Sequence, residues 1–435
     1  MLNKLLKLMT KITPPSYRWL WEHDGFKRYF FNTGWMLAGQ IFALILSFFI
    51  GAWMARYLGP EDYGTINYAL AFAGLFGFIA TFGVDSILVR ELVKTPEQKE
   101  ELLGTSFSLK LLGAFLAITI TVITTFIVEQ NPFNRILIIT FTASFIFQAL
   151  NVVSSFFQSR VEAKNNVWAQ IGAGLLSSAL KIVFILSGAG LWWLMLIFTL
   201  DAGWQSLLLV LIYRRRGYRL GAWRLRWSLA RRIVSTSWLL IFSAAVSFIL
   251  MRIDQVMIGQ MLGTAEVGLY AVAVKFVEVW YFLPAIISAS LFPAILNAKK
   301  TDINIYQRRL LNFFVFMLVF SLVVALGTVA LSYYLVVGLF GAEYLPAVAV
   351  LRVYAWSSVG LFLNWAFYQQ LIAEDRLRLI FLSNFAGMVL NVCLNFLFIS
   401  RFGIVGAAWA TLLSYLLVPA IIFWHFQRGK KPILS

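Results

Sequence analysis

The chain has 435 residues, of which 61% are hydrophobic and only 13% are charged, and its formal net charge is +17. Soluble domains are about half apolar and about a quarter charged, so a compact fold of this length could not cover such an apolar excess with polar surface. The composition excludes a soluble protein and predicts one embedded in lipid. With one cysteine and two histidines, an internal disulfide is excluded and neither a Cys/His metal site nor another cofactor is expected.

Apolar stretches of roughly 20 residues, each long enough for a helix to cross a ~30 Å hydrocarbon core, recur along the chain. They are too long and too continuous for barrel strands, which alternate over about 10 residues. We therefore predict an all-α membrane protein with twelve transmembrane helices. In chain order these lie at about 30–57, 64–89, 102–128, 134–158, 166–188, 190–213, 234–261, 267–292, 310–334, 346–371, 378–400 and 403–425.

The distribution of Lys and Arg orients the predicted helices. Connecting loops alternate sides, and one side receives most of the cations, including those of the arginine-rich segment 214–232, whereas the other receives only Arg56, Arg135 and Arg401. The positive-inside rule then predicts that both termini are cytoplasmic. Because the basic residues lie in separate cytoplasmic segments, we expect attraction to anionic membrane lipids and no nucleic-acid partner.

A short motif recurs at about half the chain length. Leu58–Gly64 and Leu262–Gly268 both read L-G-x-x-[DE]-x-G. Alone, the motif is a tight turn between two helices, but its recurrence predicts two six-helix lobes around a central cavity. The predicted division is a basic interfacial helix or disordered tail at 1–28, an N-lobe at 29–213, a cytoplasmic linker at 214–232, a C-lobe at 233–426 and a cytoplasmic tail at 427–435.

Polar residues recur at helical spacing inside three predicted spans, the fourth, tenth and eleventh. Such a stripe either forms hydrogen bonds between helices or lines a water-filled cavity. Each stripe alone favours packing, whereas the three together favour a cavity. The residues predicted to line it are Gln148, Asn151, Gln158, Asn364, Asn391 and Asn395.

Four charged residues are predicted at nearly the same depth, Arg252 and Asp254 in the seventh span and Lys275 and Glu278 in the eighth. Two interpretations remain open. In the first, the four groups neutralise one another and fix the packing of two helices. In the second, either Arg252 or Lys275 contacts an anionic ligand, while one of the acids balances the charge or takes up a coupling ion.

Other charged residues inside the spans are weaker candidates. Asp201 is a further candidate for a coupling or charge-balancing acid, and Arg56, at an outer helix end, is a further candidate for contact with an anionic ligand. Lys110, Lys181 and Arg352 lie closer to span ends, where we expect their side chains to extend toward the headgroups.

Several segments resemble the Wzx-type oligosaccharide flippases of polysaccharide biosynthesis, which belong to the multidrug/oligosaccharidyl-lipid/polysaccharide exporter (MOP) superfamily. The segments are Arg252–Gly259 with Leu262–Leu296, Ala55–Gly64 (ARYLGPEDYG) and Gly403–Trp409 (GIVGAAW). The resemblance extends over about 30–426. It implies twelve helices in two lobes, a bacterial cytoplasmic membrane location, and alternating access of a cavity to each side.

The resemblance also implies a cargo of undecaprenyl-diphosphate-linked oligosaccharide, moved from the inner to the outer leaflet without a catalytic site. Hydroxyl groups and a diphosphate lose their hydration in hydrocarbon, so we predict that Arg252 or Lys275 contacts the diphosphate. H+ or Na+ coupling through Asp254, Glu278 or Asp201 is left open, as is partnership with a polysaccharide polymerase or glycosyltransferases. The alternative is a cation-coupled multidrug antiporter of the same superfamily.

Overall fold

A computed structural model describes residues 24–374 and 376–428, and every regular element in this part of the chain is helical. The predicted segments 1–28 and 427–435 therefore lie largely outside the described residues. The elements are α2 (Asp24–Gly74), α3 (Gly77–Thr81), α4 (Val84–Lys94), η2 (Pro96–Gln98), α5 (Lys99–Val128), α6 (Pro132–Thr142), α7 (Ser144–Gln148), η3 (Ala149–Asn151), α8 (Val152–Ser159), α9 (Ala163–Leu186), α10 (Leu191–Arg215), η4 (Leu220–Ala222), α11 (Trp227–Met261), α12 (Thr264–Glu278), α13 (Leu283–Thr301), α14 (Ile303–Phe340), η5 (Ala342–Tyr344), α15 (Ala347–Tyr354), α16 (Ser357–Ala373) and α17 (Leu377–Arg428).

Ten helical stretches in the described ranges are long and apolar enough to cross a membrane. Two of them, within α2 and α17, each contain one glycine with non-helical backbone, Gly59 and Gly403. Both glycines have positive φ, 73° and 60°, a conformation that side chains with a Cβ disfavour. If each of these two stretches is counted as two helices, the number of helices that could cross a membrane is twelve, as predicted. The all-α membrane fold is therefore confirmed, whereas the count depends on this division.

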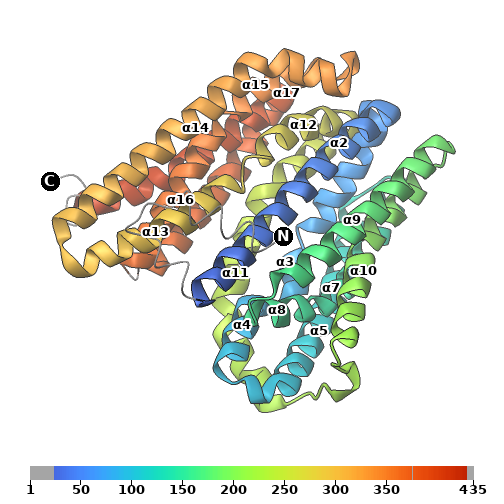
Figure 1. Ribbon diagram of the computed structural model, residues 1–435. Coiled ribbons are helices and arrows are strands. Elements are labelled where there is room, and N and C mark those ends of the chain that lie inside the picture. The colour runs from blue at the N-terminus through green and yellow to red at the C-terminus, as the bar shows by residue number, and fades with distance from the viewer. Residues whose placement is uncertain (1–23, 375, 429–435) are drawn as a thin grey trace, which may run out of the picture.

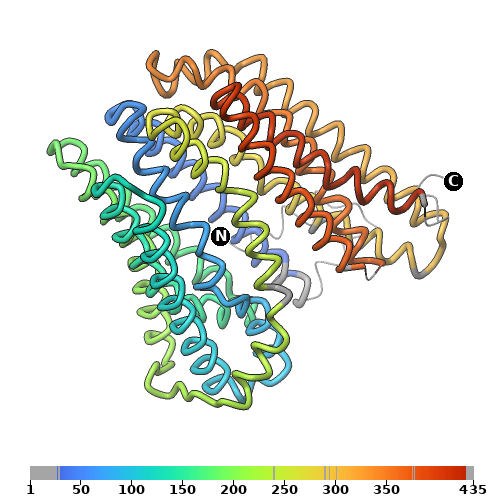
Figure 2. The backbone as a smooth tube through the Cα atoms, turned by 180° about the vertical axis from the view of Figure 1, so that it is seen from behind, coloured from blue at the N-terminus to red at the C-terminus, as the bar shows by residue number. Residues whose placement is uncertain are grey.

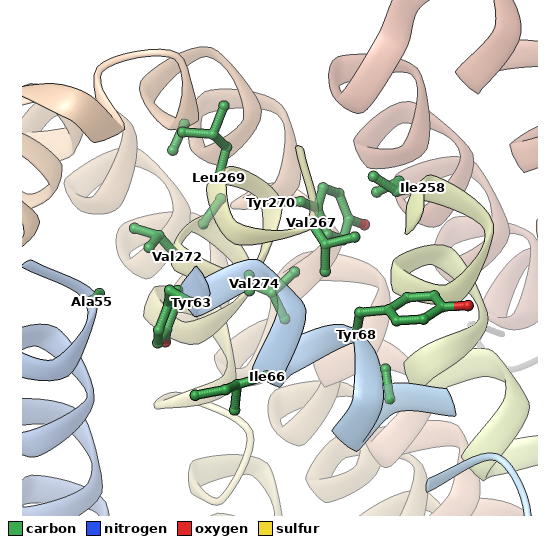
Figure 3. Packing of buried hydrophobic residues seen from close by; sticks show 14 of the residues in the cluster. Ala55, Tyr63, Ile66, Tyr68, Ile258, Val267, Leu269, Tyr270, Val272 and Val274 are labelled. Carbon is green, nitrogen blue, oxygen red and sulfur yellow. The ribbon is translucent and has the colours of Figure 1, made fainter. Parts of the chain in front are cut away.

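The helices of the two halves gather in two bundles that touch at one end and diverge toward the other (Figures 1 and 2). We call the touching end, which carries the turns Leu58–Gly64 and Leu262–Gly268, the glycine end. The opposite end of the first bundle carries the predicted linker and is called the basic end. At the glycine end α2 packs against α12, and Figure 3 shows Tyr63 and Ile66 beside Val272 and Val274.

The repeated motif explains this packing. Its first glycine is Gly59 in one copy and Gly263 in the other, and both have positive φ, so each allows the turn into the next helix. Its last glycine, Gly64 or Gly268, faces the other copy. A Cβ on Gly64 would overlap the carbonyl oxygen of Thr264, and a Cβ on Gly268 would overlap that of Pro60. The two copies therefore approach each other backbone to backbone.

Helix α11 joins the two bundles. It begins at Trp227, so residues 227–232 of the predicted linker are helical. Leu229 and Ile233 in its first turns belong to a core formed with helices of the first half. Val256 and Ile258, near its other end, belong to the core at the glycine end.

The rest of the predicted linker is attached to the start of α5. The backbone N–H of Arg224 donates to the carbonyl of Glu100 at 3.2 Å, and the N–H of Arg226 donates to Thr105 Oγ1 at 3.0 Å. A Cβ on Gly104 would lie 2.5 Å from the Arg224 nitrogen. The absent side chain at Gly104 thus lets the linker lie directly on the helix.

Candidate functional site

A cavity of about 740 Å³ lies between the two bundles. Helices α2, α7, α9 and α10 of the first half form most of its wall, and α11 and α12 of the second half close it. The cavity is large enough for a ligand of several rings, since small-molecule sites measure roughly 300–1,000 Å³.

The second half contributes charged residues to this cavity. Arg252 on α11 and Lys275 and Glu278 on α12 all line it. Arg252 Nη1 lies 3.4 Å from Glu278 Oε1, so Glu278 pairs with Arg252 and not with Lys275, its neighbour on the same helix face. No carboxylate in the described ranges lies within 4.0 Å of Lys275. Its Nζ lies against Gly51 of α2, where a Cβ would overlap it.

The first half contributes amides and hydroxyls. Gln148 and Asn151, from α7 and η3, line the cavity as the sequence predicts. Further polar side chains from α2, α7, α9 and α10 also line the cavity but were not predicted to do so from the sequence. They are Asn67, Ser144, Gln170, Ser177, Ser178 and Gln205. Gln170 and Ser177 are two turns apart on α9, so the helical-spacing test that selected Gln148 and Asn151 could have found them.

Asp201 also lines the cavity, together with Lys181. Lys181 Nζ lies 2.9 Å from Asp201 Oδ2 and 3.9 Å from the centre of the Phe198 ring, and Ser177 Oγ donates to Asp201 Oδ1. The expectation that Lys181 extends to the headgroups is therefore wrong, because Asp201 on the neighbouring helix supplies a closer partner.

Lys110 and Arg352 were also expected to extend toward the headgroups. Lys110 is only 1% exposed and its Nζ lies 2.6 Å from Asp85 Oδ1, so this expectation is wrong for Lys110. Arg352 is exposed, and its Nε donates to Ser332 Oγ at 3.1 Å.

Two other charged candidates lie away from the cavity. Asp254 is 1% exposed and accepts a hydrogen bond from the Tyr270 hydroxyl at 2.6 Å. The helical angle of about 200° between positions 252 and 254 explains why Arg252 reaches the cavity and Asp254 does not. Arg56 lies at the glycine end, where its Nη2 donates to the carbonyl of Gly338 at 2.8 Å.

Four of the six predicted lining amides lie elsewhere. Asn391 and Asn395 are fully buried within α17, and Asn395 Nδ2 donates to Asn391 Oδ1 at 3.0 Å. Asn364 bonds to Asn384 at 3.2 Å, and Gln158 lies at the exposed end of α8. The prediction is corrected at these positions. Asn364, Asn391 and Asn395 bond to other amides within the packed second half, and Gln158 lies outside the cavity wall. Apart from Gln255 on α11, the amides that line the cavity come from the first half.

The fold and its cavity define a multi-pass membrane protein whose architecture is similar to that of a flippase and of multidrug transporters of known structure. A lipid II flippase, MurJ, in an inward closed conformation has a TM-score of 0.71 at 15% identity, with 92% of this chain and 87% of that chain covered. An inward-facing multidrug resistance MATE family transporter of the MOP superfamily has a TM-score of 0.64 at 14% identity, covering 90% and 94%. A eukaryotic MATE transporter has a TM-score of 0.60 at 14% identity, covering 94% and 96%.

At 14–15% identity, these similarities show a shared fold. The family follows from the sequence: residues 30–299 match the profile of the family described as polysaccharide biosynthesis protein. The match extends over more than half of the chain, which therefore belongs to the polysaccharide biosynthesis protein family. No curated protein sequence is significantly similar to the chain.

Proposed function

We propose that the protein is a flippase that moves an undecaprenyl-diphosphate-linked oligosaccharide from the inner to the outer leaflet of the bacterial cytoplasmic membrane. The observation that carries the proposal is the arrangement of the cavity wall, with cations on the second-half helices facing amides and hydroxyls on the first-half helices. Such a cavity replaces the water that a diphosphate and sugar hydroxyls would lose in hydrocarbon.

The charge of the wall favours an anionic cargo. Two ion pairs, Arg252–Glu278 and Lys181–Asp201, leave Lys275 as the cation without a carboxylate partner among the described residues. The formal charge of the lining side chains is therefore +1. A cavity for organic cations would need an excess of acids, so the wall supports the flippase over the multidrug antiporter.

An apolar groove next to the cavity suits the lipid part of the cargo. The groove has a volume of about 680 Å³ and lies between α2, the α12–α13 corner and α14. Phe276 and Val279 line the groove, while their neighbours Lys275 and Glu278 line the cavity. A headgroup at Lys275 would therefore place the prenyl chain in the groove or in the surrounding lipid without burying a charge in hydrocarbon.

The orientation follows from the positive-inside rule. The basic end carries the cations of the 214–232 segment and faces the cytoplasm, so the glycine end faces the outer side. With the bundles in contact at the glycine end, the cavity receives cargo from the inner leaflet. Separation of the bundles at the glycine end, with closure at the basic end, would then release the cargo to the outer side.

The test is genetic and biochemical. Deleting the gene should cause lipid-linked oligosaccharide to accumulate on the inner leaflet, and the parent gene should reverse this. The Arg252→Ala/Lys275→Ala double variant should fail to reverse the accumulation. Lys94→Ala, at an exposed site outside the cavity, should reverse it as the parent gene does. Full transport by the double variant inserted at normal levels would remove the role of these cations. Sensitivity to toxic organic cations without oligosaccharide accumulation would favour the antiporter.

Lys275→Gln is the sharper single change, since it leaves the Arg252–Glu278 pair intact. A hydrogen bond to a charged group contributes about 1.5–3 kcal/mol. If Lys275 binds the diphosphate, its neutralisation should weaken cargo binding by roughly 10- to 150-fold.

A further inference from the structure

Four amide side chains in the first-half wall of the cavity have no partner within the protein. Gln148, Asn151, Gln170 and Gln205 line the cavity and are half-buried. Among the described residues, none of these four side chains forms a hydrogen bond with another group. By contrast, the buried amides of the second half bond to one another. Amides with unused donors and acceptors in a cavity wall are available to a ligand.

The same wall contains the carboxylate of Asp201. Its side chain is 36% exposed, whereas that of its partner Lys181 is only 10% exposed and lies against the Phe198 ring. Ser177 also donates to Asp201. The ion pair is therefore neutral as a whole, but the part of it that meets the cavity is a hydrogen-bond acceptor. Each carboxylate oxygen accepts more than one hydrogen bond, so Asp201 can accept further bonds from a ligand.

Asp201 lies at about the same level of the cavity as Lys275. Gly174 of α9 faces Leu46 of α2, and Lys275 Nζ lies against Gly51, five residues further along α2. Both helices run toward the glycine end (Figure 1), and five residues further along α9 lies the turn that bonds to Asp201. The ammonium group and the carboxylate are thus level to within about one turn, or ~5.4 Å. A diphosphate on Lys275 would therefore present its first sugar at the depth of Asp201.

The four amides lie between this level and the basic end, and we call them the amide track. Gln205 follows Asp201 on α10 by four residues, or about 6 Å. Gln170 precedes Ser177, which bonds to Asp201, by seven residues on α9, or about 10 Å. The other two amides are at the level of Gln205, because a hydrogen bond of 2.8 Å joins the residues next to Gln205 and Gln148. The track is longer than a single sugar ring.

We propose that this wall is an extended saccharide subsite with a fixed direction. Asp201 binds the sugar nearest the diphosphate, and the amide track binds the sugars beyond it, so the glycan runs from Lys275 toward the basic end. Sugar hydroxyls donate to the carboxylate, and they both donate to and accept from amides. The subsite rests on the proposed function, to which it adds the position and direction of the glycan in the cavity.

The subsite also selects the chemistry of the first sugar. A sugar with its own carboxylate would bring a negative charge against the exposed oxygens of Asp201, and like charges in contact disfavour binding. A neutral hexose has only hydroxyls to offer and forms hydrogen bonds with the same oxygens. The sugar next to the diphosphate is therefore a neutral one.

The experiment measures binding of undecaprenyl diphosphate lipids to the purified full-length protein in lipid nanodiscs. The lipids carry no sugar, a single neutral hexose or a linear tetrasaccharide of neutral hexoses. Gln170→Leu, at the far end of the amide track, should weaken binding of the tetrasaccharide lipid by roughly 2- to 10-fold, the contribution of a hydrogen bond, and leave the other two unchanged. Asn312→Leu, at an exposed amide of α14 outside the cavity, is the matched control and should bind all three as the parent does.

The near end is tested by replacing the ion pair as a unit. Asp201→Asn/Lys181→Gln leaves the net charge of the wall unchanged, so the sugar-free lipid should bind as before, while both sugar-bearing lipids should bind more weakly. The preference of the parent for a neutral hexose over a hexuronic acid as the first sugar should disappear. If the double variant does not fold, Gln205→Leu, one turn from Asp201, makes the same test with the neutral sugars.

Weaker binding of the monosaccharide lipid by Gln170→Leu, or unchanged binding of the tetrasaccharide lipid, would overturn the proposed direction. Equal affinity of the parent for the three lipids would overturn the subsite but leave the contact of Lys275 with the diphosphate standing. If the parent binds none of the three lipids, including the sugar-free one, the flippase proposal itself fails and the subsite fails with it.

Discussion

Replacing Gly268 with alanine should separate the two lobes at the glycine end. In the structure, a Cβ on Gly268 would lie 2.9 Å from the carbonyl carbon of Pro60 and closer still to its oxygen, whereas ordinary contact begins at 3.4 Å. The obstructing atoms are backbone atoms of α2, which cannot rotate away as a side chain can. Because the oxygen is the closer atom, the helices must move apart by roughly an ångström or more, in an interior that is otherwise closely packed.

The size of the effect follows from the cost of overpacking. An added methyl that a packed interface cannot accommodate costs about 1–3 kcal/mol, and this cost falls only on the state in which the glycine ends touch. The ratio of that state to the state open at the glycine end should thus decrease by roughly 5- to 150-fold. Gly64→Ala should act in the same way, because its Cβ would overlap Thr264.

The assay is labelling of a cavity cysteine from the outer side. Cys393, the single cysteine, is replaced by serine and Ser178, which lines the cavity, by cysteine. A membrane-impermeant maleimide should then react faster with the Gly268→Ala protein than with its parent. Gly34→Ala is the matched control, since nothing lies within 4 Å of a Cβ there. Unchanged labelling in Gly268→Ala would show that this contact does not close the outer side.

Three further changes test local features. Gly59→Ala forces a Cβ into a backbone with φ of 73° and ψ of 174°, so the free energy of unfolding should fall by about 1–3 kcal/mol; an unchanged unfolding temperature would contradict this strain. Gly104→Ala should push the linker off α5 and increase tryptic cleavage after Arg224, while equal cleavage would show that the contact does not hold the linker. Tyr270→Phe removes the hydroxyl that donates to Asp254 and should cost about 1–3 kcal/mol, measured by thermal unfolding; a neutral result would mean that Asp254 finds another donor.

The sequence predicts the membrane class and the repeated turn well, because both depend on properties that survive in a linear pattern. Apolar excess and helix length follow from composition, and Gly59 and Gly263 mark turns in both copies of the motif. The reciprocal contact of Gly64 with Gly268 was not predicted, since it depends on how two distant segments meet in space.

The cavity wall was harder to predict. Asn391 and Asn395 are four residues apart and Gln148 and Asn151 are three apart, so each pair shares one helix face, yet the first pair is buried among helices and the second faces the cavity. Spacing identifies a shared helix face but not what that face meets. Likewise, Lys181 was judged by its distance from the span end, whereas its position is decided by Asp201 on another helix.

The course of α11 has a consequence for the movement between lobes. Its first turns are anchored in the core of the first bundle and its last turns in the core at the glycine end, where the two bundles meet. Any reorientation of the bundles must therefore twist or flex the stretch between these two anchors. That stretch contains serines whose hydroxyls bond back to carbonyls one turn earlier, Ser237 to Ile233 at 2.6 Å and Ser247 to Ser243 at 3.0 Å, a pattern that often bends helices. The helix that places Arg252 at the cavity wall would then bend within its own middle turns.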